Sequence, residues 1–439
     1  MKYIVTYSKA LAFIILLSLS ISVFAQAPDV PSPAPPQEGR IYLTNATIHT
    51  GTGKVLQNAT IGFDNGKIFY LEENPVTKPD TNSGRIIDCT GKHIYPGIIS
   101  TNTIIGLSEI EAVRAANDNA EVGQFNPNVK AIVSYNTDSR VTPTLRSNGV
   151  LYAQVAPQGG YVSGTSAVVQ LDAWNWEDAA VKNEDGVFIN WPSMFKVKSW
   201  WAEPQEFEIN KDYDKELDGL KAYFKDAKSY FEAGAHEKTN LGFEAMKGLF
   251  DKSKNLYVKV YYVKEIQNAI AFAEELGVNI VLVGAKDSYM IADVLAQKKI
   301  PVILSKCHDL PTYEDEDIQQ PYKTPAILQK AGVLYCISIG AFWQERNLMF
   351  EAGTASAYGL SKEEALQAIT RNPAKILNLD KQIGTLERGK DASLIVSTGD
   401  VLDMKTSNIE QAYISGRKID LGNKQKALSE KFMKKYGVN

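Results

Sequence analysis

Residues 255–284 read NLYVKVYYVKEIQNAIAFAEELGVNIVLVG, which is a short apolar run, a helical stretch closed by Gly277 and a second apolar run. The two runs are apolar at nearly every position and do not alternate with polar residues. Continuous apolar runs of this length are typical of parallel strands that are buried on both faces. The segment therefore predicts a strand, a helix and a second strand of a parallel sheet, which is the repeating unit of the α/β class.

The same unit repeats on both sides of this segment. The apolar runs PVILS (301–305) and VLYCISIG (333–340) follow it, separated by a helical stretch that closes at Gly332, and GVLYAQVAP (149–157) precedes it. Repeated units of this size over residues 96–379 predict a (β/α)8 barrel. A doubly wound open sheet is the alternative, and it is disfavoured because no G-x-G-x-x-G motif follows a strand.

Short β-rich runs broken by Gly and Asn-Gly turns flank the barrel on both sides in the sequence. Residues 41–95 contain IYLTNATIHTGTG and LQNATIGFDNGKIFYL, and residues 380–422 contain DASLIVSTGD and AYISGRKIDLG. Before the second flank, Ser361 and Glu364 form a capping box that predicts the start of a helix. We expect the two flanks to pair into one small β-sandwich beside the barrel.

The chain begins with features of an exported protein. Two lysines precede the apolar run ALAFIILLSLSISVFA (10–25), which ends in a small-residue cleavage signal. Residues 1–25 are therefore predicted to be a signal peptide, with an uncleaved membrane anchor as the alternative. A proline-rich linker is expected over residues 26–40 and a C-terminal tail over residues 423–439. The predicted location is the periplasm or the outer cell surface.

Charge and cysteine content limit the classes of protein to which the chain can belong. The formal net charge is −4, and it becomes −6 when the two lysines of residues 1–25 are removed. A mildly acidic chain is a poor nucleic-acid binder, because that affinity comes from basic contacts with phosphates. Three cysteines, Cys89, Cys307 and Cys336, exclude a complete disulfide framework, and we expect them to be buried, with one optional bridge.

Three motifs carry a resemblance to a known family. They are ATIHTGTG (46–53), GKHIYPGII (91–99) and NPAKILNLDKQIGTLERGKDASLIV (372–396). With them the chain resembles the amidohydrolase superfamily, particularly its imidazolonepropionase-like branch, over nearly all of residues 41–422. The resemblance implies hydrolysis of C–N bonds in amides or cyclic amides by a metal-activated water at the mouth of the barrel. Ser393 is a small departure, because the family has Asp at that position.

The first metal ligands of the family lie on the strand that enters the barrel, and this chain lacks them. The family reads Pro-Gly-Leu-Ile-Asp-x-His-x-His, whereas residues 96–104 read PGIISTNTI. Asn102 and Ile104 therefore replace the two histidines, and Ser100 replaces the aspartate. Residues two apart on a strand share a face, so we expect Asn102 and Ile104 to point into the barrel. An amide is a weak ligand for zinc, and an isoleucine side chain is none.

The resemblance places the other metal ligands at positions that hold no ligand either. Lys259 lies near the position of the fifth-strand histidine, and Gly284 and Ala285 lie near that of the sixth-strand histidine. Residues 336–340 contain no acid for the eighth strand. The fourth-strand lysine of the family has no clear counterpart. We therefore expect neither a metal ion nor another cofactor.

The chain has only four histidines, and no two of them form an H-x-H motif. His49 and His93 precede the barrel and are expected to be structural, whereas His236 lies in a polar segment that predicts solvent exposure. His308 follows the seventh strand and would lie with Asp309 on a loop at the catalytic face. His308 and Asp309 are the candidates for a metal-free acid–base site.

Five polar residues near the rim are candidates for ligand binding. We expect Lys259 to pair with an acidic neighbour or to await an anionic ligand, because an unpaired buried ammonium is costly or loses its proton. A lysine that reaches solvent is the alternative. For Glu345 and Arg346 the alternative is a salt bridge that ties a loop. The candidates are Asn102, Lys259, Ser338, Glu345 and Arg346.

Five of the six tryptophans lie between Trp174 and Trp201. Either they belong to an insertion that buries its own aromatic side chains, or they form a lid that offers flat apolar faces to a ligand at the barrel mouth. No G-x-S-x-G or H-E-x-x-H motif indicates a different hydrolase chemistry.

The sequence therefore predicts an amidohydrolase-like protein that has lost its metal ligands. We expect a non-catalytic protein that binds a small-molecule ligand or a partner, such as a related catalytic subunit. The alternative is an active hydrolase of non-peptide C–N bonds with a rebuilt active site. No nucleic acid and no membrane span beyond the signal are expected, and a homo-oligomer is an option.

Overall fold

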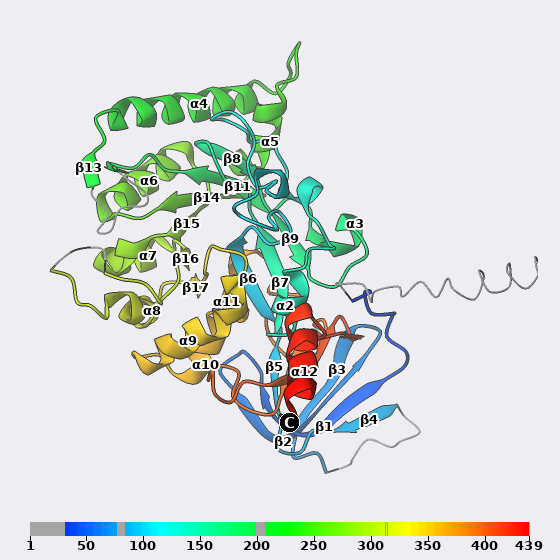
Figure 1. Cartoon of the computed structure of the whole chain (residues 1–439). Helices are drawn as coiled ribbons and strands as arrows, with labels where there is room; N and C mark the ends of the chain where they lie inside the picture. The colour runs from blue at the N-terminus through cyan, green and yellow to red at the C-terminus, as the bar shows by residue number, and fades with distance from the viewer. Residues whose placement is uncertain (1–30, 77–83, 199–206, 312, 314, 439) are drawn as a thin grey trace, which may run out of the picture.

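The computed structural model contains a barrel and a smaller β-sheet, which lie side by side in Figure 1. The predicted signal peptide over residues 1–25 lies outside the described residues, and so does the predicted linker before residue 31. No described helix is long and apolar enough to cross a bilayer. The structure describes residues 31–76, 84–198, 207–311, 313 and 315–438.

The smaller unit is one eight-stranded sheet made from two segments, one before and one after the barrel in the sequence. Its strand order is β20-β19-β18-β5-β1-β2-β3, with β4 paired to β1. The two flanks meet where β18 pairs with β5 in antiparallel register, Leu394 opposite Pro96. The first flank contributes β1 (Ile41–His49), β2 (Val55–Asp64), β3 (Lys67–Glu73), β4 (Arg85–Asp88) and β5 (His93–Pro96), and the second contributes β18 (Leu394–Ser397), β19 (Ile409–Ile414) and β20 (Arg417–Ile419).

Ser393 joins this sheet to the barrel. Its hydroxyl lies 2.6 Å from the Tyr152 hydroxyl, which belongs to a barrel strand, and accepts a hydrogen bond from the Ser415 N–H at 3.0 Å. Both Tyr152 and Ser393 are buried, so each needs a hydrogen-bond partner there. The departure from the family's Asp is therefore accommodated by a structural contact between the two units.

The larger unit is a (β/α)8-type barrel built from two sheets. One sheet has the order β10-β9-β7-β6 and the other the order β17-β16-β15-β14-β11-β8. The sheets meet where β8 passes into β9, and they meet again where β17 approaches β6. The barrel strands are β6 (Ile98–Thr103), β7 (Val150–Val155), β8 (Val162–Thr165), β9 (Ala167–Gln170), β11 (Gly186–Asn190), β14 (Asn255–Val260), β15 (Ile280–Gly284), β16 (Val302–Leu304) and β17 (Tyr335–Ile337).

The second half of the barrel follows the predicted pattern. Strands β11, β14, β15, β16 and β17 are parallel neighbours. The helices between them end where expected, because Gly277 and Gly332 adopt the left-handed conformation that closes a helix. The capping box of Ser361 and Glu364 is also confirmed. The helices are α6 (Val263–Leu276), α7 (Ala292–Lys298), α8 (Gln320–Ala331), α9 (Leu348–Ala357), α10 (Lys362–Gln367) and α11 (Arg371–Ile376).

The first half of the barrel departs from regular βα repeats. The third strand position is filled by β8 and β9, which run antiparallel to their neighbours β11 and β7. Between β6 and β11, the helices formed by the described residues are all short. The remaining elements are α2 (Thr142–Arg146), α3 (Trp176–Ala179), β10 (Ala180–Lys182), β12 (Phe195–Val197), β13 (Phe207–Ile209), α4 (Tyr213–Ala233), α5 (Leu241–Phe250) and α12 (Lys424–Tyr436).

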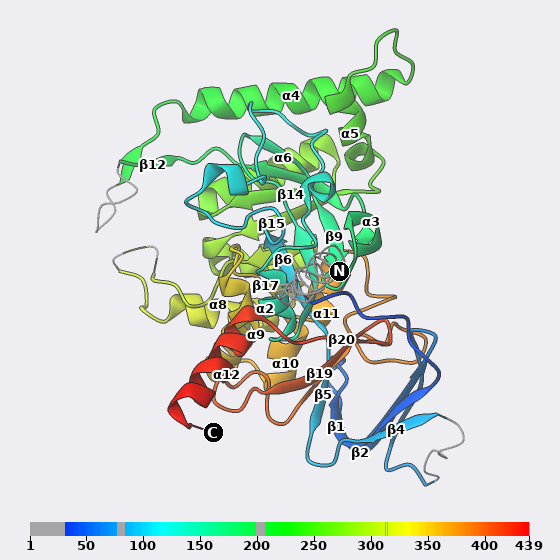
Figure 2. The ribbon, with the colours of Figure 1, turned by 45° about the vertical axis from the view of Figure 1, so that its right-hand side comes forward.

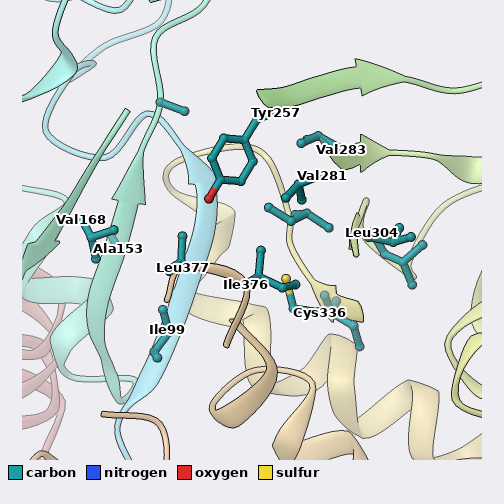
Figure 3. Close-up of a cluster of buried hydrophobic side chains, with 14 of the residues drawn as sticks. Ile99, Ala153, Val168, Tyr257, Val281, Val283, Leu304, Cys336, Ile376 and Leu377 are labelled. Carbon is teal, nitrogen blue, oxygen red and sulfur yellow. The ribbon is translucent and has the colours of Figure 1, made fainter. Parts of the chain in front are cut away.

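Apolar side chains from the barrel strands and from α11 form one core. Figure 3 shows Val281, Val283 and Leu304 gathered with Cys336 and with Ile376 from α11. All three cysteines are buried and free, so the expectation of burial is confirmed and the optional bridge does not form. The core fixes the strand ends on which the candidate site is built.

Candidate functional site

The end of β6 does not present side chains in the way that simple alternation predicts. Asn102 has a φ of +51°, and the pairing with β7 shifts register between Ser100 and Thr103. This bulge breaks the two-residue periodicity. Strand β6 ends at Thr103, and Ile104 lies beyond it in the apolar core. The two-residue alternation on which the prediction for Asn102 and Ile104 rested is therefore absent at the end of β6.

The other positions matched to the family lie on the expected strands. Lys259 is near the end of the fifth barrel strand, β14, and Gly284 ends the sixth, β15. Ser338 directly follows the eighth strand, β17, and the fourth strand, β11, contains no lysine. At the positions of the family's metal ligands the chain therefore has the amide of Asn102, the ammonium of Lys259 and the hydroxyl of Ser338. Gly284 has no side chain to offer.

These residues do not fit a catalytic metal ion. A catalytic zinc site takes about three protein ligands, and His, Asp, Glu or Cys supply them. Over the described ranges, no three side chains of these types lie close enough together to hold an ion. All four histidines of the chain fall within those ranges.

Three contacts close the barrel between β6 and the loop after β17. The Ser338 hydroxyl donates to the Thr101 carbonyl at 2.7 Å, and the Thr103 hydroxyl donates to the Ala341 carbonyl at 2.8 Å. The Ser100 hydroxyl donates to Oε2 of Glu345 at 2.6 Å. Ser100, which replaces the family's aspartate, therefore binds a carboxyl group from the loop after the last barrel strand.

Two polar atoms at this junction have no hydrogen-bond partner among the described residues. They are Oε1 of Glu345 and Oδ1 of Asn102, and both atoms are buried. Buried polar atoms are normally paired with protein or water, so each of these two oxygens can accept a further hydrogen bond. The Asn102 N–H is satisfied, because it donates to Oε1 of Gln154 at 3.1 Å.

Glu345 is held as a neutral acid near pH 7. Its side chain is fully buried, and burial raises its pKa to about 8 because the charged form loses its hydration. The Ser100 hydroxyl, which donates to Oε2, counteracts part of that shift. Arg346 does not neutralise Glu345, since its guanidinium donates to the Trp343 carbonyl. Neither Glu345 nor Arg346 forms an ion pair with a described residue, so the structure gives no support to the alternative of a salt bridge that ties the loop.

Lys259 has a neutral partner. Its ammonium donates to Oε1 of Gln158 at 2.5 Å and lies 5.6 Å from the centroid of the Phe188 ring. No carboxylate of the described residues pairs with it, and burial lowers its pKa to about 8. The expected acidic neighbour is therefore not present in the described part of the chain, and the expectation of an anionic ligand stays a prediction.

A second polar cluster lies inside the barrel, and the sequence did not reveal it. Asp185 accepts hydrogen bonds from Tyr257 at 2.6 Å and from Gln154 at 2.8 Å, and it pairs with Lys182 at 2.6 Å. Burial and the neighbouring Asp185 carboxylate raise the pKa of Tyr257, so its hydroxyl stays a donor. One signal was available, because Gln154 is the single polar residue in the buried strand VLYAQV.

His308 and Asp309 follow β16, as predicted, but each is engaged with other side chains. His308 lies 3.1 Å from Glu351 through Nδ1 and 2.5 Å from the Thr354 hydroxyl through Nε2. Asp309 pairs with Lys286 at 2.8 Å. No contact joins these residues to Asn102, Lys259 or Glu345 in the described structure, so they form a separate group at the rim.

The remaining histidines lie away from the barrel mouth. His49 bonds to Glu363 at 2.6 Å and to His93 at 3.1 Å, and it stacks on Tyr95 in the smaller sheet. His236 stacks on Tyr230 with ring centroids 3.4 Å apart and is half-buried, so its predicted solvation is only partial.

The tryptophans do not form one group. Trp174 and Trp176 follow β9, which ends opposite the beginning of β7, so they lie at the end of the barrel away from the mouth. Trp191 follows β11 at the mouth and is buried. Trp200 and Trp201 lie outside the described residues. A lid made from Trp174 and Trp176 is therefore excluded by the antiparallel direction of β9.

A family model and solved structures match this chain. The amidohydrolase family model matches residues 334–419, from β17 to β20. No curated protein gives a significant match. An amidohydrolase from Thermotoga maritima MSB8 is similar in structure, with a TM-score of 0.73, 27% sequence identity and coverage of 87% of this chain and 99% of that one.

Two more distant structures share the fold. A prolidase solved with N-methylphosphonate-L-proline has a TM-score of 0.53 and 15% identity, and the match covers 87% of this chain and 99% of the prolidase. Molinate hydrolase has a TM-score of 0.55 and 14% identity, with coverage of 88% of this chain and 95% of that one.

Proposed function

Because the chain belongs to the amidohydrolase superfamily, we propose that it uses the barrel mouth of that family to bind a small carboxylate-bearing molecule without metal-dependent hydrolysis. The observation that carries this proposal is Lys259, a half-buried ammonium whose partner is the neutral oxygen of Gln158. In the family's arrangement a divalent ion supplies positive charge at the mouth. Here Lys259 supplies it.

The electrostatics of the site favour an anionic ligand. Burial lowers the pKa of Lys259 to about 8 because it removes hydration and no carboxylate of the described residues compensates. An arriving carboxylate would restore that compensation through a charge-assisted hydrogen bond. The prolidase neighbour is solved with a ligand that carries the carboxylate of proline, and its fold covers most of this chain.

A hydrolase with a rebuilt site is the second candidate function, and Glu345 is the observation that favours it. A carboxyl group with a pKa of about 8 is protonated at neutral pH and has the strength of a general acid. Its side chain is fully buried behind Ser100, however, so no substrate atom reaches it without movement of the loop after β17. We therefore favour binding.

The test combines metal content, turnover and binding. Protein purified with ample zinc is expected to contain well under one ion per chain. It is expected to leave N-acetylated and N-carbamoylated amino acids intact, while calorimetry detects binding of members of this panel. Stoichiometric metal, or release of the free amino acid, would contradict the proposal.

Substitutions separate binding at the mouth from binding elsewhere. Lys259→Met removes the charge and keeps the length, and it is expected to weaken carboxylate binding about tenfold to a hundredfold. Lys264→Met is the matched control, since Lys264 is exposed on α6. Equal affinity of both variants would show that Lys259 takes no part.

We also propose that this function operates outside the cytoplasm. The basis is the apolar run of residues 10–25 and the cleavage signal that ends it. Mature protein is expected to begin near residue 26. Amino-terminal sequencing that starts at Met1 would contradict cleavage and favour the membrane anchor.

A further inference from the structure

Helix α12, over Lys424–Tyr436, touches the body of the protein only at its start. The Asn423 side chain caps it by accepting from the Lys426 N–H, and its amide donates to the Ser147 hydroxyl at 2.9 Å. Gln425 accepts from the Thr144 hydroxyl at 3.1 Å. No residue of the helix is buried. Figure 2 shows the helix in red with its carboxyl end free.

Such a helix needs a partner to be stable. Isolated helices shorter than about 12–15 residues are marginal in water, and in proteins most helical stability comes from packing of an apolar face. The helix has such a face, because Leu428, Phe432 and Tyr436 follow at intervals of four and therefore lie above one another. Their exposed fractions are 42%, 49% and 68%.

The charge of the helix differs in sign from that of the whole chain. It carries five lysines and one glutamate, whereas the formal net charge of the whole protein is −4. On a helical wheel Lys431 and Lys435 flank the apolar stripe. Lys426 and Lys434 lie on the opposite side of the helix. An apolar stripe beside a lysine-rich face is the pattern of helices that lie in the plane of an anionic bilayer surface.

The position of the helix also points to a membrane. Pro31, the first described residue, lines the same groove as the first turns of α12, including Lys424 and Leu428. The chain before Pro31 contains the apolar run of residues 10–25, which is directed to a membrane whether it is cleaved or retained. The basic helix and Pro31 therefore lie on one face.

We propose that α12 docks on the surface of an anionic lipid bilayer, with Leu428, Phe432 and Tyr436 between the lipid head groups and its lysines against their phosphates. The contact is reversible, because one short helix gives far weaker membrane binding than a spanning segment. It is independent of the barrel mouth and of the ligand proposed there. Its effect would be to hold the mature protein at the membrane after signal cleavage.

The test is co-sedimentation of the chain from residue 26 to residue 439 with vesicles. Vesicles of equal parts phosphatidylglycerol and phosphatidylcholine are expected to bind the protein, and vesicles of phosphatidylcholine alone are not. High salt is expected to weaken the binding, because it shortens the Debye length to about 3 Å at 1 M. The triple variant L428Q/F432Q/Y436Q is expected to lose binding, and glutamine keeps the helical propensity high.

The contribution of the lysines of α12 is tested with a matched pair of control substitutions. K431Q/K435Q is expected to weaken binding about 25-fold, since each lysine near an anionic surface contributes about fivefold. K221Q/K225Q changes two exposed lysines at the same spacing on α4 and is expected to bind as the wild type. Equal loss in both pairs, or equal binding to both kinds of vesicle, would overturn the proposal. So would self-association through α12 in the absence of lipid binding.

Discussion

Two buried polar clusters lie in the same barrel, and they differ in how well their atoms are paired. Asp185 is fully buried and has three partners, Tyr257, Gln154 and Lys182. At the mouth, Glu345 and Asn102 each keep a buried oxygen without a partner in the described structure, and Lys259 has only a neutral partner. We call a cluster saturated when its polar side chains all have partners. A saturated cluster stabilises a fold, whereas the unpaired atoms of an unsaturated cluster can still bind a ligand.

The two clusters are linked through one side chain. Gln154 donates to Asp185 at 2.8 Å and accepts from the Asn102 N–H at 3.1 Å. The Gln154 amide is therefore fixed by one hydrogen bond to each cluster, and through it the Asp185 cluster fixes the bulge at Asn102. The comparison indicates that the inner cluster sets the geometry of the mouth.

The largest effect is expected from the saturated cluster. Asp185→Ala leaves the Lys182 ammonium, the Tyr257 hydroxyl and the Gln154 amide without their acceptor, and removing one partner of a buried ion pair costs about 3–5 kcal/mol. Urea unfolding would measure the free energy. Asp178→Ala, at an exposed position of α3, is the control and is expected to change it by less than about 0.5 kcal/mol. A small effect at Asp185 would remove the contrast between the clusters.

A pH-dependent effect is expected at Glu345. Its pKa is about 8 in the folded state and about 4.5 when unfolded, so the folded state holds the extra proton between these values. The stability of the wild type is therefore expected to fall as pH rises from about 5 to about 8, with a contribution of about 4 kcal/mol from this group. Glu345→Gln should remove that contribution. Parallel pH profiles of the two proteins would show that Glu345 is ionised in the fold.

A smaller effect of the opposite sign is expected at Lys259. Its folded pKa of about 8 lies below the unfolded value, so the unfolded state holds more protons between about pH 8 and 10.5, and stability rises through that window. Lys259→Met is expected to stabilise the protein by about 1–2 kcal/mol at pH 7, after allowance for partial exposure. If Lys259→Met is more stable than the wild type and no longer binds carboxylates, Lys259 is a binding residue. Lost stability would indicate a structural one.

The sequence predicted the regular half of the barrel and missed the irregular half. Continuous apolar runs and the glycines at residues 277 and 332 predicted β14 to β17 and their helices, because each signal is local. The segment GGYVSGTSA, which forms β8 and begins β9, is short and polar and carries no periodicity, so its antiparallel direction was not predictable.

The sequence predicted which metal ligands are absent from the candidate site, but it did not predict the contacts that the structure has in their place. The absence of histidines from the ligand positions is visible in the sequence. The bond between Ser100 and Glu345 joins residues 245 positions apart, and the bulge at Asn102 depends on register with β7. Both result from closure of the barrel, and a single sequence carries no signal for either.

The smallest effect is expected at Trp174, which tests whether the mouth is the only end of the barrel with binding capacity. Trp174 is 67% exposed and follows β9 at the end away from Lys259. Truncation of an exposed side chain changes stability by less than about 0.5 kcal/mol, so Trp174→Ala should unfold in urea as the wild type does. Calorimetry with the carboxylate panel should also give unchanged affinity. Weaker binding in Trp174→Ala would mean that the ligand site lies at the opposite end of the barrel, and the assignment of binding to the unsaturated mouth would then be wrong.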